Sequence, residues 1–285
     1  MATIAWLGTG LLGSGFVKAA LKRGDKVRVW NRTASKAKAL ESLGATAFAS
    51  VAETVKGAER VHLCLSDDVA VDGVVEEILA VSGFNAPIID HTTVTPKGAA
   101  ARAKKLEARG VGFLACPVFM GPAMAESSAG RMLCAGPVTL VEALGPALAK
   151  MTGELQTFGA DVTVPATLKL IGNSMIIGLS GVIADAFAVA QGGGVEIKDA
   201  LAFIQGFNVG NIVNMRGVKM SQGDYAASFE LSMARKDVRL MQETSAPRAL
   251  ATLDGLGARM DALITKGHGS QDLGVLNVDV VPAKR

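Results

Sequence analysis

The fold is decided near the N-terminus, where residues 3–35 read TIAWLGTGLLGSGFVKAALKRGDKVRVWNRTAS. The apolar run Thr3 to Leu7 predicts a strand, and the pattern from Leu12 to Arg23 predicts a helix. Between them lies the glycine-rich segment Gly8-Thr9-Gly10-Leu11-Leu12-Gly13, and a second strand pattern follows at Lys26 to Trp30. This order of strand, G-x-G-x-x-G, helix and strand is the context in which the fingerprint indicates a dinucleotide-binding βαβ unit.

The glycine-rich segment suits a dinucleotide for a physical reason. Glycine permits the tight turn and lets a pyrophosphate approach the N–H groups at the start of the following helix. We therefore expect the cofactor to contact Gly8, Thr9, Gly10, Leu11, Leu12 and Gly13. The alternative is a glycine-rich turn that binds no ligand.

The segment after the second predicted strand indicates which dinucleotide is bound. Enzymes that use NAD usually place Asp or Glu there, about 20 residues after the glycines, to hold the ribose hydroxyls. Here the segment reads Asn31-Arg32-Thr33, so no carboxylate would repel a 2′-phosphate, and Arg32 could pair with it in a bidentate manner. Asn31, Thr33 and Ser35 are the expected hydrogen-bond donors. The segment favours NADP over NAD, and the alternative is an arginine solvated at the end of a strand.

The pattern of the chain changes at about residue 160. Before it, β-branched runs alternate with helical stretches, which is typical of a parallel sheet. The candidate strands are Thr3–Leu7, Lys26–Trp30, Arg60–Leu65, Pro87–Asp90 and Gly112–Ala115. After it, nearly all of the sequence has helical periodicity. We expect an α/β fold with a Rossmann-type, doubly wound parallel sheet over residues 1–160 and an all-α substrate and oligomerisation domain over residues 161–285.

A long helix is expected to join the two domains. It begins near Pro165 and stops at Gly192-Gly193-Gly194, with apolar residues every three or four positions. At 1.5 Å per residue it would be about 40 Å long, enough to lie between the domains with one face toward a cleft. Its longest uncharged run, Leu170 to Ala184, is shorter than the roughly 20 residues that a bilayer requires. We interpret it as a buried helix and expect no membrane partner.

Composition and charge limit the partners further. The 285 residues carry 29 Lys and Arg against 26 Asp and Glu, without a basic block, so nucleic acid is not an expected partner. The three cysteines include no C-x-x-C pair and indicate buried free thiols in a reducing cytoplasm, and the N-terminus lacks the layout of a signal peptide. The three histidines are too scattered for a metal site, and His91 is expected to be a hydrogen-bonded structural residue.

The sequence resembles the β-hydroxyacid dehydrogenase family, which includes 3-hydroxyisobutyrate dehydrogenases, glyoxylate and succinic semialdehyde reductases and, more distantly, imine reductases. The resemblance covers essentially the whole chain. It rests on residues 4–45, on the segment Asp90-His91-Thr92-Thr93-Val94-Thr95-Pro96, and on two lysine motifs described below. The resemblance implies that Thr93 lies against the nicotinamide ribose and that Leu65 and Val71 line the cofactor. The alternative for Thr92 and Thr93 is helix capping.

The segment Lys169-Leu170-Ile171-Gly172-Asn173 matches the catalytic lysine of this family and the asparagine four residues later. The i, i+4 spacing places both side chains on one helical face. Carbonyl reduction builds negative charge on oxygen, which a cation that can also give up a proton stabilises. By resemblance Lys169 is the proton donor or acceptor, and Asn173 holds the substrate oxygen or orients the ammonium group. A solvated surface lysine is the alternative.

The second lysine motif is Arg235-Lys236-Asp237-Val238. It is similar to a family segment whose lysine reaches the nicotinamide end of the cleft, so Lys236 is a candidate for cofactor and substrate contact, with Asp237 fixing it. A surface ion pair is the alternative.

One segment departs from the family pattern, which is usually Asp-x-Pro-Val-Ser-Gly-Gly and binds the substrate carboxylate. Here Val118-Phe119-Met120-Gly121 stands at the substrate-binding turn, so a hydroxyl donor is lost, and the following Pro122 has no N–H. A bulkier or less acidic substrate is expected if Phe119 and Met120 enter the pocket. Alternatively, both side chains turn into the core.

The resulting prediction is an NADP-dependent oxidoreductase that interconverts a small hydroxy acid or alcohol with its aldehyde or ketone. Imine reduction on the same fold is an alternative, although that branch usually replaces the catalytic lysine. A non-catalytic NADP-binding module is another. The resemblance further implies a homodimer or homotetramer.

Overall fold

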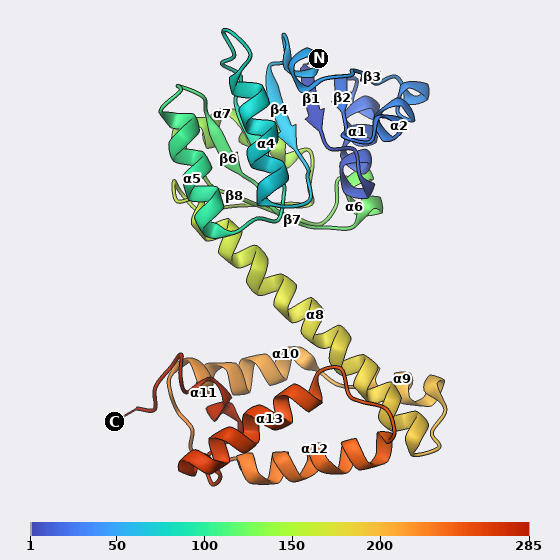
Figure 1. The fold of residues 1–285 in the computed structure, drawn as a ribbon, viewed down its shortest axis with the longest axis vertical. Helices are drawn as coiled ribbons and strands as arrows, with labels where there is room; N and C mark the ends of the chain where they lie inside the picture. The colour runs from blue at the N-terminus through green and yellow to red at the C-terminus, as the bar shows by residue number, and fades with distance from the viewer. Residues whose placement is uncertain (1, 285) are drawn as a thin grey trace. The chain divides into compact units, whose positions relative to one another are not determined.

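A computed structural model describes residues 2–284 and divides into two compact units, Met1–Asn173 and Ser174–Arg285. The 30-residue helix α8, Thr163–Gly192, runs from the first unit into the second (Figure 1). The division therefore falls inside the long helix, whereas the sequence pattern changes before it.

The first unit is built on a six-stranded parallel sheet with the order β3-β2-β1-β4-β5-β6. Its strands are β1 Thr3–Leu7, β2 Lys26–Trp30, β3 Thr46–Ala47, β4 Arg60–Leu63, β5 Ile88–Asp90 and β6 Phe113–Ala115. β1 and β2 have the predicted bounds, and β4, β5 and β6 are one or two residues shorter than predicted. The two-residue strand β3 was not predicted because it is too short to show a period.

Helices cover both faces of this sheet (Figure 1). They are α1 Leu11–Lys22, α2 Ala34–Lys38, α3 Val51–Val55, α4 Asp68–Leu79, α5 Pro96–Glu107, α6 Pro122–Glu126 and α7 Val138–Ala149. Alternate residues of β1 belong to different core clusters: Ala5 and Leu7 to one, Ile4 and Trp6 to the other. Because side chains alternate across a strand, both faces are buried, and the predicted doubly wound parallel sheet is confirmed.

A second, small sheet was not predicted. It contains β7 Val118–Phe119, β8 Arg131–Cys134 and β9 Glu154–Thr157. Strand β7 pairs with β8 in antiparallel register, Val118 opposite Met132, and β8 pairs with β9 in parallel. Strands of two to four residues give too little pattern to separate from loops.

Apart from one isolated bridge, the regular secondary structure in the described part of the second unit is helical, as predicted. Its α-helices are α9 Ile197–Gln205, α10 Val209–Ile212, α11 Val218–Ser221, α12 Leu231–Ser245 and α13 Leu253–Leu263. Two π-helical turns, Val213–Gly217 and Ile264–His268, and a 3-10 helix, Leu273–Asn277, complete it. Leu231, Val238, Met260 and Leu263 form the centre of its core.

Helix α8 is anchored in each unit by its ends. In the first unit, Val162 and Ala166 belong to the core beside the sheet. In the second, the buried carboxylate of Asp185 accepts the N–H groups of Thr252 and Leu253, both at 2.9 Å, at the start of α13. A negative charge at a helix N-terminus satisfies N–H groups that the helix itself leaves open.

The prediction that the long helix is buried is wrong for the isolated chain. Ile176 and Ile177 on α8 are 57% and 70% exposed, and several neighbouring apolar side chains are also exposed. By length and composition α8 could cross a membrane, a property that core helices of soluble proteins share. The apolar pattern of a helix predicts that another surface covers it, but the pattern does not identify that surface.

Candidate cofactor and catalytic site

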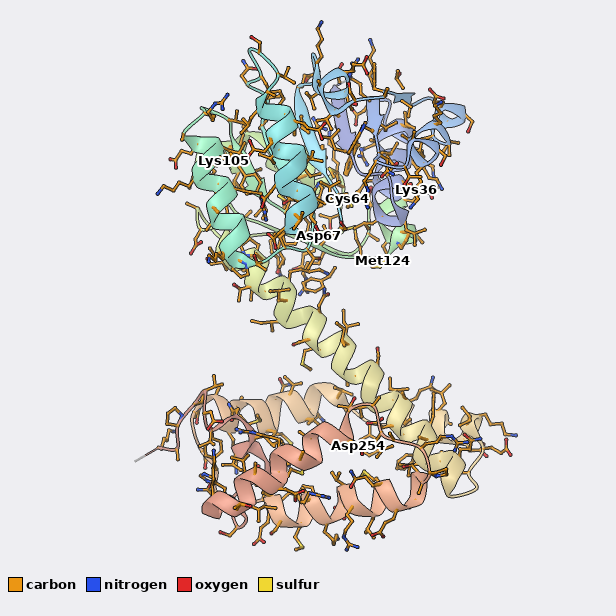
Figure 2. All side chains as sticks on the ribbon, viewed as in Figure 1. Lys36, Cys64, Asp67, Lys105, Met124 and Asp254 are labelled. Carbon is orange, nitrogen blue, oxygen red and sulfur yellow. The ribbon has the colours of Figure 1, made fainter. Side chains whose placement is uncertain are left out.

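A cavity of about 260 Å³ lies where β1, β4 and β5 end. Its lining includes six of the predicted cofactor residues, Gly10, Leu11, Leu12, Gly13, Leu65 and Thr93. It also includes Cys64, Ser66, His91 and Thr92, which the prediction did not assign to the cofactor. The signal for these four was their position at or just after the ends of predicted strands, because ligands bind parallel sheets at the carboxyl ends of the strands. Figure 2 marks Cys64 at this end of the sheet.

The glycines of the loop have distinct structural reasons. Gly8 has φ +100°, and a Cβ there would overlap the carbonyl oxygen of Cys64. A Cβ on Gly13 would overlap the carbonyl oxygen of Gly8, so this glycine lets α1 pack closely against the turn. At Gly10 a Cβ would meet nothing within 4 Å. The open side of the loop is therefore at Gly10, which borders the cavity.

The start of α1 fits a dinucleotide pyrophosphate. Gly10 is its N-cap and supplies no side-chain hydrogen bond, and the first turn carries no acidic residue. The first N–H groups of the helix are thus left for a ligand, and the helix dipole favours an anion there. Among residues 2–284 no side chain caps this end of α1, in contrast to α4 and α5, which are capped by Asp67 and Thr95.

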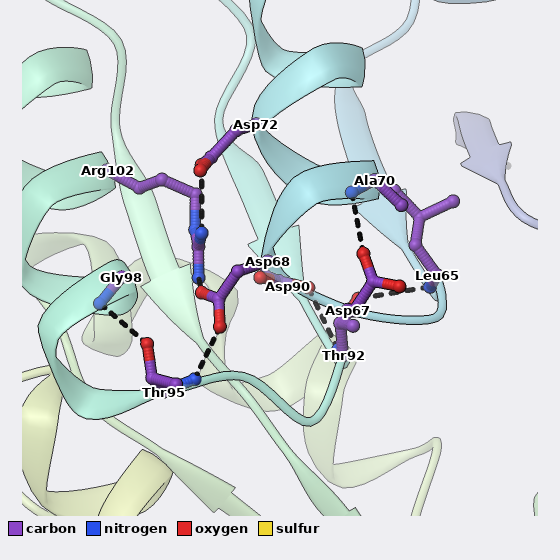
Figure 3. Close-up of polar contacts among 10 residues, drawn as sticks. All are labelled: Leu65, Asp67, Asp68, Ala70, Asp72, Asp90, Thr92, Thr95, Gly98 and Arg102. Atoms are coloured by element: carbon purple, nitrogen blue, oxygen red, sulfur yellow. Dashed lines mark hydrogen bonds and ion pairs between the residues drawn. The ribbon is translucent and has the colours of Figure 1, made fainter.

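Asn31 positions the glycine loop instead of offering a free donor. Its Oδ1 accepts the N–H of Thr9 at 3.0 Å, and its Nδ2 donates to the carbonyl oxygen of Thr33 at 3.1 Å. Arg32, Thr33 and Ser35 are exposed at the end of β2. Arg32 also interacts with Asp67. The pKa of Asp67 is lowered mainly by the N–H of Ala70 (Figure 3), then by Ser66, with a smaller contribution from Arg32.

The cavity wall between β4 and β5 is held by a buried carboxyl group (Figure 3). Oδ1 of Asp90 accepts the N–H of Thr92 at 2.8 Å, and Oγ1 of Thr92 accepts the N–H of Leu65 at 3.0 Å. Burial raises the pKa of Asp90 to about 6, and its Oδ2 has no hydrogen-bond partner. The capping alternative for Thr92 and Thr93 is wrong, because Thr95 caps α5 by accepting the N–H of Gly98.

Arg102 joins the helices that follow these strands. Its buried guanidinium donates to Asp68 at 2.8 Å and to Asp72 at 2.9 Å, both on α4 (Figure 3). Asp68 also accepts the N–H of Thr95 at 2.9 Å. One arginine on α5 therefore fixes the beginnings of α4 and α5, on either side of the Asp90 wall.

Two histidines form a buried hydrogen-bonded chain behind the cavity. Arg60 donates from Nε to Nε2 of His62 at 3.0 Å. His62 must then donate from Nδ1 to Nε2 of His91 at 2.9 Å, and His91 from Nδ1 to the carbonyl oxygen of Cys116 at 2.8 Å. Burial lowers the pKa of His91 to about 4 and that of His62 well below its ordinary value. Both are neutral at physiological pH, so the structural role predicted for His91 agrees with its hydrogen bonds.

Lys169 and Phe119 face each other in the first unit. Lys169 lies one turn beyond the α8 anchor at Ala166, and its Nζ is 4.2 Å from the centroid of the Phe119 ring. The ring also packs on Gly172, where a Cβ would overlap it. Burial lowers the pKa of Lys169, and none of the ion pairs among residues 2–284 includes it. Asn173 follows one turn later and is half-buried.

The other residues of the substrate turn differ from Phe119. Val118 is buried in the core, and Met120 packs against the same core cluster. The register of β7 with β8 explains the difference, since neighbouring strand residues point to opposite faces. The expectation of a substrate contact is therefore wrong for the side chain of Val118, and the core alternative holds for Met120 but not for Phe119.

Two further predicted residues lie elsewhere. Val71 is fully buried between α4 and the sheet and offers no surface to a cofactor, so that contact is wrong; the helix turns this side chain inward and leaves Val69 82% exposed. Lys236, in the second unit, pairs with Asp237 at 2.9 Å. Its contact with the nicotinamide stays a prediction.

These features define the class of protein, an oxidoreductase that binds a nicotinamide dinucleotide. A family model described as the NAD binding domain of 6-phosphogluconate dehydrogenase matches residues 3–159. The chain belongs to the β-hydroxyacid dehydrogenase family, as the sequence predicted.

Similar proteins support this assignment. Glyoxylate/succinic semialdehyde reductase 1 of Arabidopsis thaliana is 28% identical over 245 residues, covering 83% of each protein. The uncharacterized oxidoreductase YfjR of Bacillus subtilis is 28% identical and covers 96% of this chain and 98% of its own. The cytokine-like nuclear factor N-PAC of Xenopus tropicalis is 30% identical over 83% of this chain, which spans only 45% of the length of N-PAC.

Solved structures show the same fold. A reductive aminase from Aspergillus terreus in complex with NADPH and ethyl levulinate has a TM-score of 0.86 at 22% identity, covering 98% of this chain and 99% of its own. An imine reductase from Myxococcus stipitatus in complex with NADP+ has a TM-score of 0.86 at 20% identity, covering 96% and 98%. At this level of identity the likeness concerns the fold alone.

Proposed function

We propose that this protein is an NADP-dependent carbonyl reductase or hydroxy acid dehydrogenase in which Lys169 transfers the proton. The proposal rests on the environment of Lys169. Its ammonium group is half-buried, forms no ion pair with any of residues 2–284, and has a pKa that burial lowers. Such a group donates a proton more readily than an ordinary lysine does, and its amine can take the proton back in the reverse reaction.

Three residues of the first unit have separate roles in the proposed reaction. When bound, the nicotinamide cofactor supplies or accepts hydride. Lys169 stabilises the negative charge that develops on the carbonyl oxygen and protonates it, and in the reverse direction its amine accepts the hydroxyl proton. Asn173, one helical turn away, orients the substrate oxygen. The Phe119 ring holds the ammonium from the other side by a cation–π contact.

The preference for NADP rests on the end of β2. Arg32 is exposed there, and the segment 31–35 contains no carboxylate. A guanidinium group binds a 2′-phosphate through two parallel hydrogen bonds, whereas the two hydroxyls of NAD would gain little from it. Several similar structures contain NADPH or NADP+, and one contains NAD+. The neighbouring Asp67 weakens the attraction for phosphate but does not occupy the strand end.

The substrate is an aldehyde or ketone that is less acidic than is usual for this family. Phe119 replaces a hydroxyl donor with an apolar ring directly beside Lys169. A small carbonyl compound with an apolar substituent fits such a wall better than a carboxylate does.

Imine reduction is the second candidate, favoured by the likeness to imine reductases and a reductive aminase in fold. The retained Lys169 favours carbonyl chemistry over it. A cofactor-binding module without turnover is the third.

One experiment separates the three candidates. NADPH oxidation is followed against small aldehydes, 2-keto acids, semialdehyde acids, bulkier ketones and cyclic imines. We expect turnover of uncharged aldehydes and ketones. Turnover of imines alone would favour the second candidate, and tight NADPH binding without turnover would favour the third.

The assembly and location belong to the same proposal. We expect a cytoplasmic homodimer or homotetramer without nucleic acid or membrane partners, in which a second copy covers the exposed side chains of α8 and α9, such as Ile177 and Phe203. Unpartnered apolar surface of this extent is rare on monomers. Light scattering on the purified protein and fractionation of cells test this. A monomer, or recovery with membranes, would contradict it.

A further inference from the structure

Two cysteines of the first unit face each other, one between β6 and β7 and the other at the end of β8. The register that places Val118 opposite Met132 continues into the bridge between Ala115 and Ala135. Counting along both strands places Cys116, just before β7, directly opposite Cys134 at the end of β8. Both side chains are fully buried and belong to the same core cluster.

The backbone hydrogen bonds define the type of this pair. Ala115 and Ala135 exchange both of their hydrogen bonds, at 3.0 and 3.1 Å, and Leu133 donates to the carbonyl oxygen of Pro117 at 3.0 Å. The cysteines between them are therefore a non-hydrogen-bonded pair, in which the Cα atoms are about 4.5 Å apart. A disulfide spans Cα distances of roughly 4.4 to 6.8 Å. The two strands thus hold the cysteines at a separation that a disulfide can bridge with little backbone movement.

The two thiols are unequal in acidity. Burial raises the pKa of Cys116, whereas the hydrogen bond from the thiol of Cys116 lowers the pKa of Cys134. Cys134 is thus the sulfur that ionises first, and the thiolate is the form that reacts with oxidants. Burial raises the pKa of the third cysteine, Cys64, to about 12, in contrast to the lowered pKa of Cys134.

Cys116 is also connected to both halves of the candidate site. Its carbonyl oxygen accepts the hydrogen bond from His91, which lines the cavity, and its N–H donates to the carbonyl oxygen of Asp90 at 2.7 Å. Three residues later along the chain, Phe119 contacts the ammonium of Lys169. A change in the position of Cys116 is therefore transmitted to the cavity wall and to the Phe119 ring that contacts Lys169.

We propose that Cys116 and Cys134 are an oxidation site, which hydrogen peroxide converts to a cross-strand disulfide that slows the enzyme. The Cys134 thiolate attacks one peroxide oxygen, the O–O bond breaks, and hydroxide leaves as water after taking a proton, which gives a sulfenic acid. The Cys116 sulfur then attacks the Cys134 sulfur, the S–O bond breaks, and a second water leaves with the Cys116 proton. In sum, two thiols are oxidised to one disulfide, and one peroxide is reduced to two waters.

The covalent part of the proposal is tested on the whole chain without any substitution. The protein is incubated with peroxide for increasing times, free thiols are alkylated, and peptides are mapped by mass spectrometry. We expect the number of free thiols to fall from three to one, with the Cys116 and Cys134 peptides joined, two hydrogens lost, and full reversal by dithiothreitol. A disulfide that includes Cys64, or over-oxidation of single cysteines without a disulfide, would overturn the proposal.

The effect on rate rests on the proposed function and is measured separately. Shifts of about 1 Å near reacting groups can cost up to 100-fold in rate, so we expect turnover with NADPH to fall about tenfold on oxidation and to recover with dithiothreitol. Each variant is compared with its own reduced form: Cys134→Ala should lose this response, and Cys64→Ala should keep it. An unchanged rate in the cross-linked protein would overturn the regulatory effect. A reduced protein without any turnover would instead contradict the proposed function, while the peptide map still decides the oxidation site.

Discussion

The glycine loop Gly8–Gly13 and the substrate turn Val118–Gly121 are both short segments of the first unit, and they differ in what determines their role. In the loop, the backbone forms the expected pyrophosphate site. Its features are the positive φ at Gly8, the close packing at Gly13 and the free N–H groups at the start of α1. In the turn, the direction of each side chain determines whether the residue faces Lys169 or the core. Phe119 reaches Lys169, while Val118 and Met120 join the core.

Recognition through the backbone can therefore be inferred from glycine spacing, whereas recognition through side chains depends on strand register. The register of β7 is set by its pairing with β8, which begins only at Arg131, and β8 itself has no clear pattern. If the two segments are separable, a substitution in one should leave the function of the other unchanged.

The largest effect is expected for Lys169→Met, which removes the charge but keeps an unbranched stem beside Phe119. Loss of the proton donor should lower kcat by about 1,000-fold, within the usual range for general acid catalysis, while the dissociation constant of NADPH stays within about twofold. Steady-state kinetics and fluorescence titration measure the two quantities. The exposed Lys97→Met on α5 is the matched control. A parallel loss of NADPH affinity would show that the cofactor and substrate segments are not separable.

The pH dependence of the native enzyme belongs to the same test. The pKa of Lys169 is lowered by burial, so the reductive rate should fall as pH rises through a value below that of an ordinary lysine, since reduction needs the protonated form. The oxidative rate should rise over the same interval. A reductive rate that is independent of pH up to the ordinary lysine range would contradict the assignment.

The next largest effect is the pH dependence of stability that Asp90 causes in the wall of the cofactor cavity. Burial raises the pKa of Asp90 from 3.8 to about 6, with Arg102 opposing this shift and Asp68 adding to it. Because the folded state binds the proton more tightly than the unfolded state, this contribution to stability is complete below pH 3.8 and is lost as pH rises through about 6. The shift corresponds to about 3 kcal/mol.

Asp90→Asn should remove this dependence. The free energy of unfolding of the variant should therefore rise, relative to that of the native protein, by about 2.5 kcal/mol between pH 4 and pH 8, so that the variant is relatively more stable at the higher pH. Urea unfolding at both pH values measures it, and Asp72→Asn, which changes an exposed partner of Arg102, serves as the control. A constant difference between variant and native protein would show that Asp90 is ionised at both pH values.

A smaller effect is expected for Arg32→Ala. Charge-assisted hydrogen bonds contribute about 1.5 to 3 kcal/mol, so NADPH affinity should fall about 30-fold while NADH affinity changes little. The exposed Lys38→Ala on α2 controls for the loss of a nearby positive charge. Equal losses for both cofactors would mean that the strand end does not select the 2′-phosphate, and the backbone loop alone would then account for binding.

The sequence predicted the elements that have long, regular patterns. The first two strands, the helix after the glycine loop, the long helix α8 and the all-α second half are found in the structure. It could not predict β3 or the sheet β7-β8-β9, because two to four residues carry no measurable period. Within the site, Val71 was misplaced because the resemblance gave a residue of α4 without the rotation of that helix, which turns Val71 inward. The pairing of Arg60, His62 and His91 was missed for a related reason, since residues far apart in sequence meet only through the strand order.

The smallest effect is expected at the substrate turn, where Phe119→Ser restores the hydroxyl of the family pattern. One neutral hydrogen bond contributes about 1 kcal/mol, so kcat/KM for carboxylate substrates should rise about fivefold relative to uncharged ketones. Phe119→Leu keeps an apolar side chain without the ring, so it isolates the hydroxyl from the lost cation–π contact with Lys169. If both variants shift specificity equally, the ring excludes carboxylates by its bulk. If neither shifts it, the substrate does not contact this turn, and the departure from the family pattern affects only the position of Lys169.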